Sequence, residues 1–152
     1  MDTQPRRHLA HLPPLTDSPL VFFTACTRDR APCLARSFAH DILHDLWSQA
    51  GERSGWFVGD YVLMPDHVHL FARRALGAVP MHQWVGTWKS LSSRRMGVDG
   101  GLWQKDYFDR YLRSGESYTE KWHYVELNPV RAGLVSHLEQ WPFKGRIHTL
   151  MF

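Results

Sequence analysis

The chain has 152 residues, of which 43% are hydrophobic and 22% charged, and its formal net charge is +3. This composition fits one globular domain and excludes a collagen, a coiled coil or a chain that is disordered throughout. No run approaches the ~20 apolar residues of a membrane span, and the N-terminus lacks the apolar stretch of a signal peptide, so we expect a cytoplasmic protein without a membrane partner. Positive charge gathers in residues 73–152, which hold 12 Lys or Arg against 7 Asp or Glu, whereas residues 1–72 hold 6 against 8.

The N-terminal part predicts a flexible arm, a strand and a helix. Residues 1–19 contain four of the nine prolines, which disfavour helix and sheet, so we expect a single domain over 20–152 behind this arm. Residues 20–27 are β-branched and aromatic and predict a strand that includes Cys26, which we expect, like Cys33, to be a reduced thiol. Ser37 is a candidate helix cap and Gly51 a candidate helix end. Between them, apolar residues recur at helical spacing: Phe38, Ile42, Leu43, Leu46 and Trp47.

The rest of the chain predicts a hairpin, two further helices and a fourth strand. Residues 56–64 and 67–73 read as strands joined by Pro65 and Asp66, and residues 80–96 as a helix with Trp84 and Trp88 on its core face. Residues 102–112 predict a strand, and Ser117 with Glu120 a capping box for a helix that Pro129 stops. The order β-α-β-β-α-β plus a helix predicts an α+β, ferredoxin-like antiparallel sheet, with helices on one face and the other open to a ligand.

The first chemical motif is His67-Val68-His69. Because strand side chains alternate between faces, both imidazoles should point to the same side of the sheet, while Val68 points to the other. This arrangement suits a shared divalent metal. The alternative is a chance pairing on an exposed strand, since the chain has ten histidines and the motif is short.

The second motif lies on the last predicted helix. At ~100° per residue, Tyr118, Trp122 and Val125 share an apolar stripe, whereas Tyr124 lies away from it. Asn128 projects one turn later from the same side, so a hydroxyl and an amide oxygen are able to meet one ligand. The alternatives are an ordinary surface tyrosine, and an asparagine that caps the short turn begun by Pro129.

The third feature is a basic and aromatic surface in the second half of the chain. Cations, hydroxyls and aromatic rings together suit phosphate and base contacts, although a solvated surface has the same composition. Trp103, between polar residues, is the better candidate for stacking on a base. The candidate cations are Arg73, Arg74, Lys89, Arg94, Arg95, Arg110, Arg113, Lys121 and Arg131.

Four blocks in order carry a family resemblance: YVLMPDHVHL (61–70), WKSLSSRR (88–95), LWQKDYFDRYLR (102–113) and YVELNPVRAGLV (124–135). With the first strand, they resemble the REP-associated tyrosine transposases of the single-tyrosine HUH superfamily over about residues 20–143. The resemblance implies an enzyme that cuts and rejoins single-stranded DNA beside a hairpin, with Mg²⁺ or Mn²⁺ and a 5′-phosphotyrosine intermediate. It implies that Tyr124 is the nucleophile and that His67, His69 and Asn128 are metal ligands.

The sequence leaves several questions open. Asp66 stands where the family usually has asparagine or another polar residue and receives no role, and the segment after Phe143 departs from the family pattern. We expect the protein to bind single-stranded or hairpin DNA and to be a monomer or a homodimer. One alternative function is a catalytically silent regulator that binds hairpins. Another is a metal-dependent phosphoesterase whose nucleophile is water.

Overall fold

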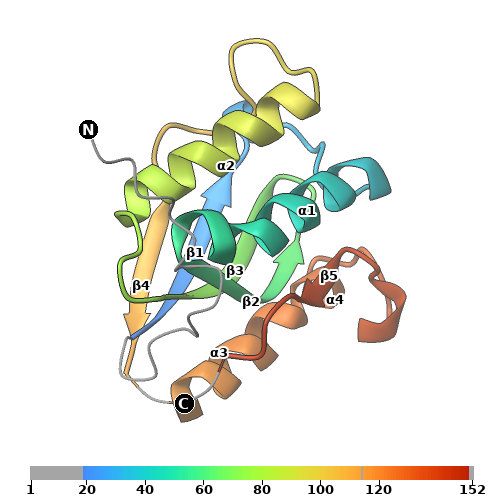
Figure 1. The fold of residues 1–152 in the computed structure, drawn as a ribbon. Helices are drawn as coiled ribbons and strands as arrows, with labels where there is room; N and C mark the ends of the chain where they lie inside the picture. The colour runs from blue at the N-terminus through green and yellow to red at the C-terminus, as the bar shows by residue number, and fades with distance from the viewer. Residues whose placement is uncertain (1–18, 114, 151–152) are drawn as a thin grey trace, which may run out of the picture.

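The computed structural model describes residues 19–113 and 115–150, and Figure 1 shows its ribbon. The predicted arm, apart from Pro19, lies outside the described residues. No helix among the described residues is long and apolar enough to cross a membrane. The elements are, in chain order, β1 (Leu20–Cys26), the 3-10 turn η2 (Arg28–Arg30), α1 (Ser37–Ser54), β2 (Trp56–Leu63), β3 (His67–Arg74), α2 (Met81–Arg95), β4 (Phe108–Leu112), α3 (Gly115–Glu126), α4 (Asn128–Arg131), η3 (Leu138–Gln140) and β5 (Lys144–Arg146).

The five strands form one antiparallel sheet with the order β4-β1-β3-β2-β5. The first four strands in this order are those of the predicted ferredoxin-like arrangement, which is confirmed. The predicted hairpin is β2 and β3, whose pairing runs from Trp56 opposite Arg74 to Leu63 opposite Val68. Figure 1 shows α1 and α2 together on one face of the sheet and α3 on the opposite side.

The face beneath α1 and α2 holds the main hydrophobic core. Alternate residues of β1, among them Phe23, enter it because strand side chains alternate between faces. Trp84 and Trp88 are 3% and 2% exposed and surround the Phe23 ring, so their predicted place in the core is confirmed. Phe38 was expected on the same apolar stripe, but it stands 53% exposed beside the guanidinium of Arg36.

The second face is covered in part by α3, which corrects the expectation that it is open. Tyr118 and Val125 of α3 are buried against Phe22 and Phe71 of the sheet. The Tyr118 hydroxyl donates a hydrogen bond to the buried Asp60 carboxylate of β2. Arg146 of β5 donates to the same carboxylate at 2.9 and 3.2 Å. These contacts fix α3 to the sheet. The C-terminal end of β1 and the N-terminal end of β3 remain half-buried.

The ends of α1 differ from the prediction. The helix continues past Gly51, and its end is Gly55, which has a φ of 82° and whose backbone NH donates to the Ala50 and Gly51 carbonyls. Gly51 has a packing role instead, because a Cβ there would lie 2.7 Å from the Phe57 ring. Arg36 occupies the N-cap position and Ser37 is the first helical residue, so the predicted serine cap is wrong.

The third helix also begins earlier than predicted. α3 starts at Gly115, which places Ser117 within its first turn and not at a cap, so the predicted capping box is wrong. Pro129 does stop this helix, as predicted, and the chain re-enters a short helix, α4. Leu127 is the N-cap of α4 and Asn128 its first residue, so the interpretation of Asn128 as a cap is also wrong.

The fourth strand is shorter than the predicted range 102–112, because only Phe108–Leu112 pairs with β1 as a strand. The Lys89 ammonium explains the difference: it lies 2.9, 3.5 and 3.3 Å from the carbonyl oxygens of Gln104, Lys105 and Asp106. These three carbonyls turn toward one cation, which is incompatible with the alternating directions of a strand. Trp103 forms only an isolated bridge to Thr27, the residue after β1.

Candidate active site

Two histidines occupy alternate positions on β3 and point away from α1 and α2. His67 and His69 are half-buried, while Val68 between them is fully buried in the opposite core. Their ring centroids are 4.8 Å apart, near enough for one nitrogen of each ring to bind the same ion. The prediction that both imidazoles share one face of the sheet is therefore confirmed.

Each imidazole is held by a neighbouring side chain. Nδ1 of His67 lies 2.7 Å from the Asp66 carboxylate, and because an ionised carboxylate only accepts, this nitrogen donates the hydrogen bond and leaves Nε2 as the nitrogen that faces a ligand. Nδ1 of His69 lies 2.8 Å from the Thr24 hydroxyl on β1, and the ring stacks on Phe22 with centroids 5.3 Å apart. Partners of this kind orient the histidines of metal sites.

Asp66 is itself braced by the loop after β1. Arg30 donates to the second carboxylate oxygen at 2.9 Å and also contacts the Cys26 sulfur at 3.0 Å. Burial acts to raise the pKa of Asp66, but the hydrogen bonds from His67 and Arg30 outweigh it and lower that pKa. Asp29 and Arg30 adopt left-handed φ angles of 56° and 53°, which cost roughly 1–2 kcal/mol for each residue with a Cβ. The loop thus carries backbone strain at the point where it holds Arg30 against Asp66.

The donor set fits a divalent cation. Burial, followed by the positive potential of His67 and Lys121, lowers the pKa of His69 to about 3, so this ring is neutral at pH 7 and its nitrogen is available to a metal. Within residues 19–113 and 115–150, no group of three or more His, Cys, Asp or Glu side chains is placed to hold a metal. His67 and His69 would therefore need oxygen ligands of another kind, such as an amide or a phosphate.

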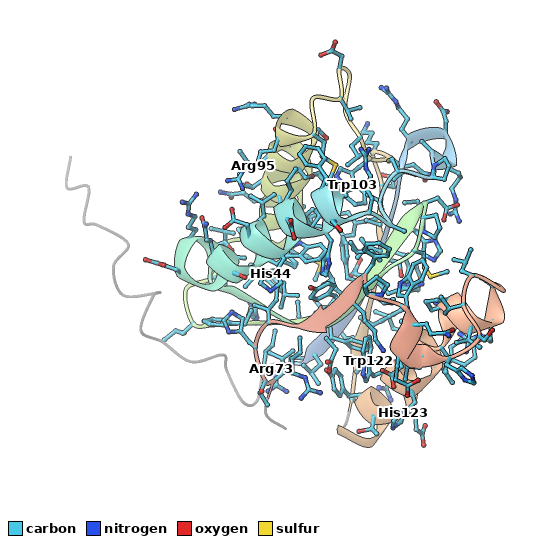
Figure 2. The ribbon with its side chains drawn as sticks, turned by 90° about the vertical axis from the view of Figure 1, so that its right-hand side faces the viewer. His44, Arg73, Arg95, Trp103, Trp122 and His123 are labelled. Atoms are coloured by element: carbon cyan, nitrogen blue, oxygen red, sulfur yellow. The ribbon has the colours of Figure 1, made fainter. Side chains whose placement is uncertain are left out.

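Tyr124 lies on α3 and is 61% exposed. The apolar stripe of the same helix faces the sheet, since Tyr118 and Val125 are buried and Trp122 is partly buried against them. Figure 2 shows Trp122 on the sheet side of α3 and His123 on its outer side. The prediction that Tyr124 is helical and lies off the apolar stripe is confirmed.

Arg131 connects Tyr124 with Asn128. Its guanidinium carbon lies 3.9 Å from the centroid of the Tyr124 ring, and the same group donates to the Tyr124 carbonyl oxygen at 2.5 Å. It also donates to the side-chain oxygen of Asn128. Tyr124 and Asn128 therefore lie on the same side of the helix end, as predicted. An amide oxygen has two lone pairs, so the Asn128 oxygen can accept from Arg131 with one and bind a metal with the other.

Lys121 lies between the tyrosine and the histidine pair. Its ammonium is 4.6 Å from the Phe22 ring and 5.8 Å from the Tyr124 ring. Because Phe22 stacks on His69, a chain of contacts joins the histidines of β3 to the tyrosine of α3. A cavity of about 590 Å³ between β4 and α3 opens beside Tyr124 and is lined in part by Arg110 and Lys121. These residues make up the candidate active site.

Apart from Arg73 and Arg74, which end β3, the predicted DNA contacts divide into two groups. Arg110, Arg113 and Lys121 line the cavity beside Tyr124, and Arg131 contacts the tyrosine itself. The others lie at the C-terminal end of α2 and in the loop that follows it, where a separate cavity of about 510 Å³ is lined by Lys89, Arg94 and Trp103, and where Arg95 belongs to the last turn of the helix. The sequence therefore identified cations from two different parts of the surface.

Trp103 is not available to stack on a base, so its interpretation as a base contact is wrong. It is 7% exposed, and its indole NH donates to the Ser92 hydroxyl at 2.8 Å. Figure 2 shows its position at the side of α2. Two arginines of the predicted surface also differ from expectation: Arg73 is buried at 4% exposed, and Arg95 forms an ion pair with Asp45 at 2.6 Å.

Several residues of the site were missed by sequence reasoning. The sequence offered one signal for Asp66, its position directly before His67, but no role was assigned. Thr24 and Arg30 gave no signal, because only the register of β1 against β3 places Thr24 opposite His69. Phe108 was included in a predicted strand without a function, and it proves to be 58% exposed on β4.

Comparison with known proteins identifies the family of the chain. The sequence model of the family described as "Transposase IS200 like" matches residues 20–126. A REP-associated tyrosine transposase of Escherichia coli (strain K12) is 23% identical over 124 residues, which cover 80% of this chain and 73% of that protein. A relative from Haemophilus influenzae is 21% identical over 146 residues, 86% of this chain and 81% of that protein.

Among solved structures, that of a REP-associated tyrosine transposase bound to a REP hairpin shares the fold. It superposes with a TM-score of 0.73 at 20% sequence identity, covering 95% of this chain and 82% of that one. The resemblance inferred from the four sequence blocks is thus confirmed. The family model spans most of the chain, including both histidines and Tyr124. The chain belongs to the IS200-like family of transposases, enzymes that cleave and transfer DNA.

Proposed function

We propose that this transposase cleaves and rejoins single-stranded DNA beside a hairpin, through a covalent bond between Tyr124 and a 5′-phosphate. The observation that carries the proposal is the chain of contacts from His69 through Phe22 and Lys121 to Tyr124, which gathers a histidine pair, a cation and an exposed tyrosine on one side of the sheet. The related structure bound to a REP hairpin supports hairpin DNA as the substrate.

His67 and His69 would hold a Mg²⁺ or Mn²⁺ ion, with Asn128 as a third ligand. A divalent cation held there would act as a Lewis acid on the scissile phosphate. The protein prepares the pair by fixing each Nδ1, through Asp66 and Thr24, so that Nε2 is the ligand nitrogen of each ring.

Strand cleavage and rejoining need no external energy source, because each bond that breaks is matched by one that forms. The Tyr124 oxygen attacks phosphorus and loses its proton, the bond from phosphorus to the 3′ oxygen breaks, and the departing oxygen takes up a proton as a 3′-hydroxyl. A second 3′-hydroxyl can reverse the step and join strands. Lys121 and Arg131 place positive charge against the tyrosine ring, near the oxygen and phosphate where negative charge develops.

A covalent adduct tests this proposal. Wild-type protein, a labelled single-stranded oligonucleotide with a REP hairpin, and Mn²⁺ should give a protein–DNA adduct that survives denaturation, and Tyr124→Phe should bind the oligonucleotide yet give none. His67→Ala should also give none, because it loses a metal ligand. Cleavage without any adduct would favour the phosphoesterase alternative, and binding without cleavage would favour the silent regulator. An adduct that persists in Tyr124→Phe would refute the assignment of the nucleophile.

A further inference from the structure

Phe108 is an exposed aromatic residue on the same sheet face as the histidine pair. In an antiparallel sheet, directly opposite residues point to the same face, and the register places Phe108 opposite Thr24. Thr24 holds His69 at 2.8 Å, so Phe108, Thr24 and His69 form a row across β4, β1 and β3. Phe108 is 58% exposed, although Phe22 and Phe71 on the same face are buried at 4% and 0% exposed.

Cations lie next to this phenylalanine. Arg110 is two residues further along β4 and opposite Phe22, so it shares the face of Phe108. The cavity of about 590 Å³ between β4 and α3 brings Arg110, Arg113 and Lys121 together against one acidic residue, Glu120. It opens on Tyr124, the proposed nucleophile. An anionic ligand is therefore favoured on the path from Phe108 to the tyrosine.

We propose that the surface formed by Phe108, Arg110 and Lys121 binds an unpaired nucleotide next to the scissile phosphate, with its base stacked on Phe108 and its phosphates contacted by Arg110 and Lys121. The ligand must be unpaired, because a base within a duplex has both faces covered by its neighbours and cannot present one to a protein ring. Stacking on an aromatic ring tolerates any base, so Phe108 supplies affinity and not sequence recognition. The inference rests on the proposed function and names how the strand reaches Tyr124.

The test pairs a side-chain change with a base change, in the Tyr124→Phe background so that no adduct forms. Phe108→Ala should weaken binding of the single-stranded flank about tenfold, a typical loss for one stacked base. Phe108→Tyr, which keeps a ring, should bind within about twofold of the parent protein. Phe38→Ala is the matched control, because Phe38 is also an exposed phenylalanine, 53% exposed, but lies on α1 on the other side of the sheet.

Abasic nucleotides placed one at a time along the flank should reveal the stacked base. One position near the cleavage site should weaken binding to the parent protein about as much as Phe108→Ala does, and should cost nothing further in Phe108→Ala, because the same contact is already lost. Fluorescence of 2-aminopurine at that position should be quenched by the parent and by Phe108→Tyr, but not by Phe108→Ala.

Salt dependence tests the phosphate contacts. Arg110→Gln should lower the slope of log affinity against log salt by about 0.7, the value for one phosphate of a single strand. Arg95→Gln, which removes a charge from the far side of the sheet, should leave the slope unchanged. The inference is refuted if Phe108→Ala binds every oligonucleotide like the parent. In that case the wild-type protein would still form the covalent adduct. If the proposed function itself were wrong, the wild-type protein would form no adduct with any DNA.

Discussion

Tyr118→Phe should loosen the helix that carries the nucleophile. The change removes one hydroxyl, which in the wild type donates to the Asp60 carboxylate, 3% exposed beneath α3. A hydrogen bond to a charged group contributes about 1.5–3 kcal/mol, and Arg146 still holds the same carboxylate at 2.9 Å, so the protein should fold. For a chain of 152 residues this loss lowers Tm by roughly 4–10 °C.

The functional effect is expected well below the melting temperature. If α3 shifts by as little as 1 Å, Tyr124 loses its alignment with the phosphate, and adduct formation should slow by up to about 100-fold. Thermal unfolding by circular dichroism and adduct formation at 25 °C measure the two effects. Tyr61→Phe is the matched control: it also deletes a buried hydroxyl, bonded at 2.6 Å to His40 beneath α1, but it leaves α3 untouched. If both variants form the adduct at equal rates, the anchoring argument is wrong.

Three further predictions concern other contacts. Asp66→Ala should weaken Mn²⁺ binding about 10–100-fold, as measured by titration calorimetry, because His67 loses the group that orients it. Asp66→Asn keeps an acceptor oxygen and should lose less Mn²⁺ affinity. Unchanged affinity in Asp66→Ala would exclude the role of Asp66 in orienting His67. Arg131→Gln should slow adduct formation at saturating hairpin DNA, because it removes the contact at 3.9 Å on the Tyr124 ring; a variant that only binds DNA more weakly would mark Arg131 as a phosphate contact. Burial, with the nearby His44, lowers the pKa of His40 in the folded state. As pH falls below about 6.5, the unfolded chain therefore gains a proton first, and the free energy of unfolding decreases. His40→Leu should flatten this decrease, measured by urea unfolding at several pH values, and an identical dependence of the free energy of unfolding on pH would contradict the prediction.

Local patterns were enough to predict the sheet and the positions of the main candidate residues. Alternation along β3 placed His67 and His69 together, and helical periodicity separated Tyr124 from the buried stripe, because both depend only on neighbours in sequence. The contacts between distant segments could not be predicted in this way. Lys89 shortens β4 by binding carbonyls fifteen to seventeen residues away. The burial of Trp103 likewise depends on how the loop after α2 packs against that helix.

The pairing of Arg146 with Asp60 has a consequence for the order in which the protein is assembled. The two residues are 86 positions apart in the chain, so on a ribosome that adds roughly 5–20 residues per second, Arg146 emerges on the order of 10 s after Asp60. Until then, the strand that receives the Tyr118 hydroxyl lacks its outer neighbour β5. The nascent protein therefore completes this sheet only after residue 146 has emerged, later than the helix that carries Tyr124.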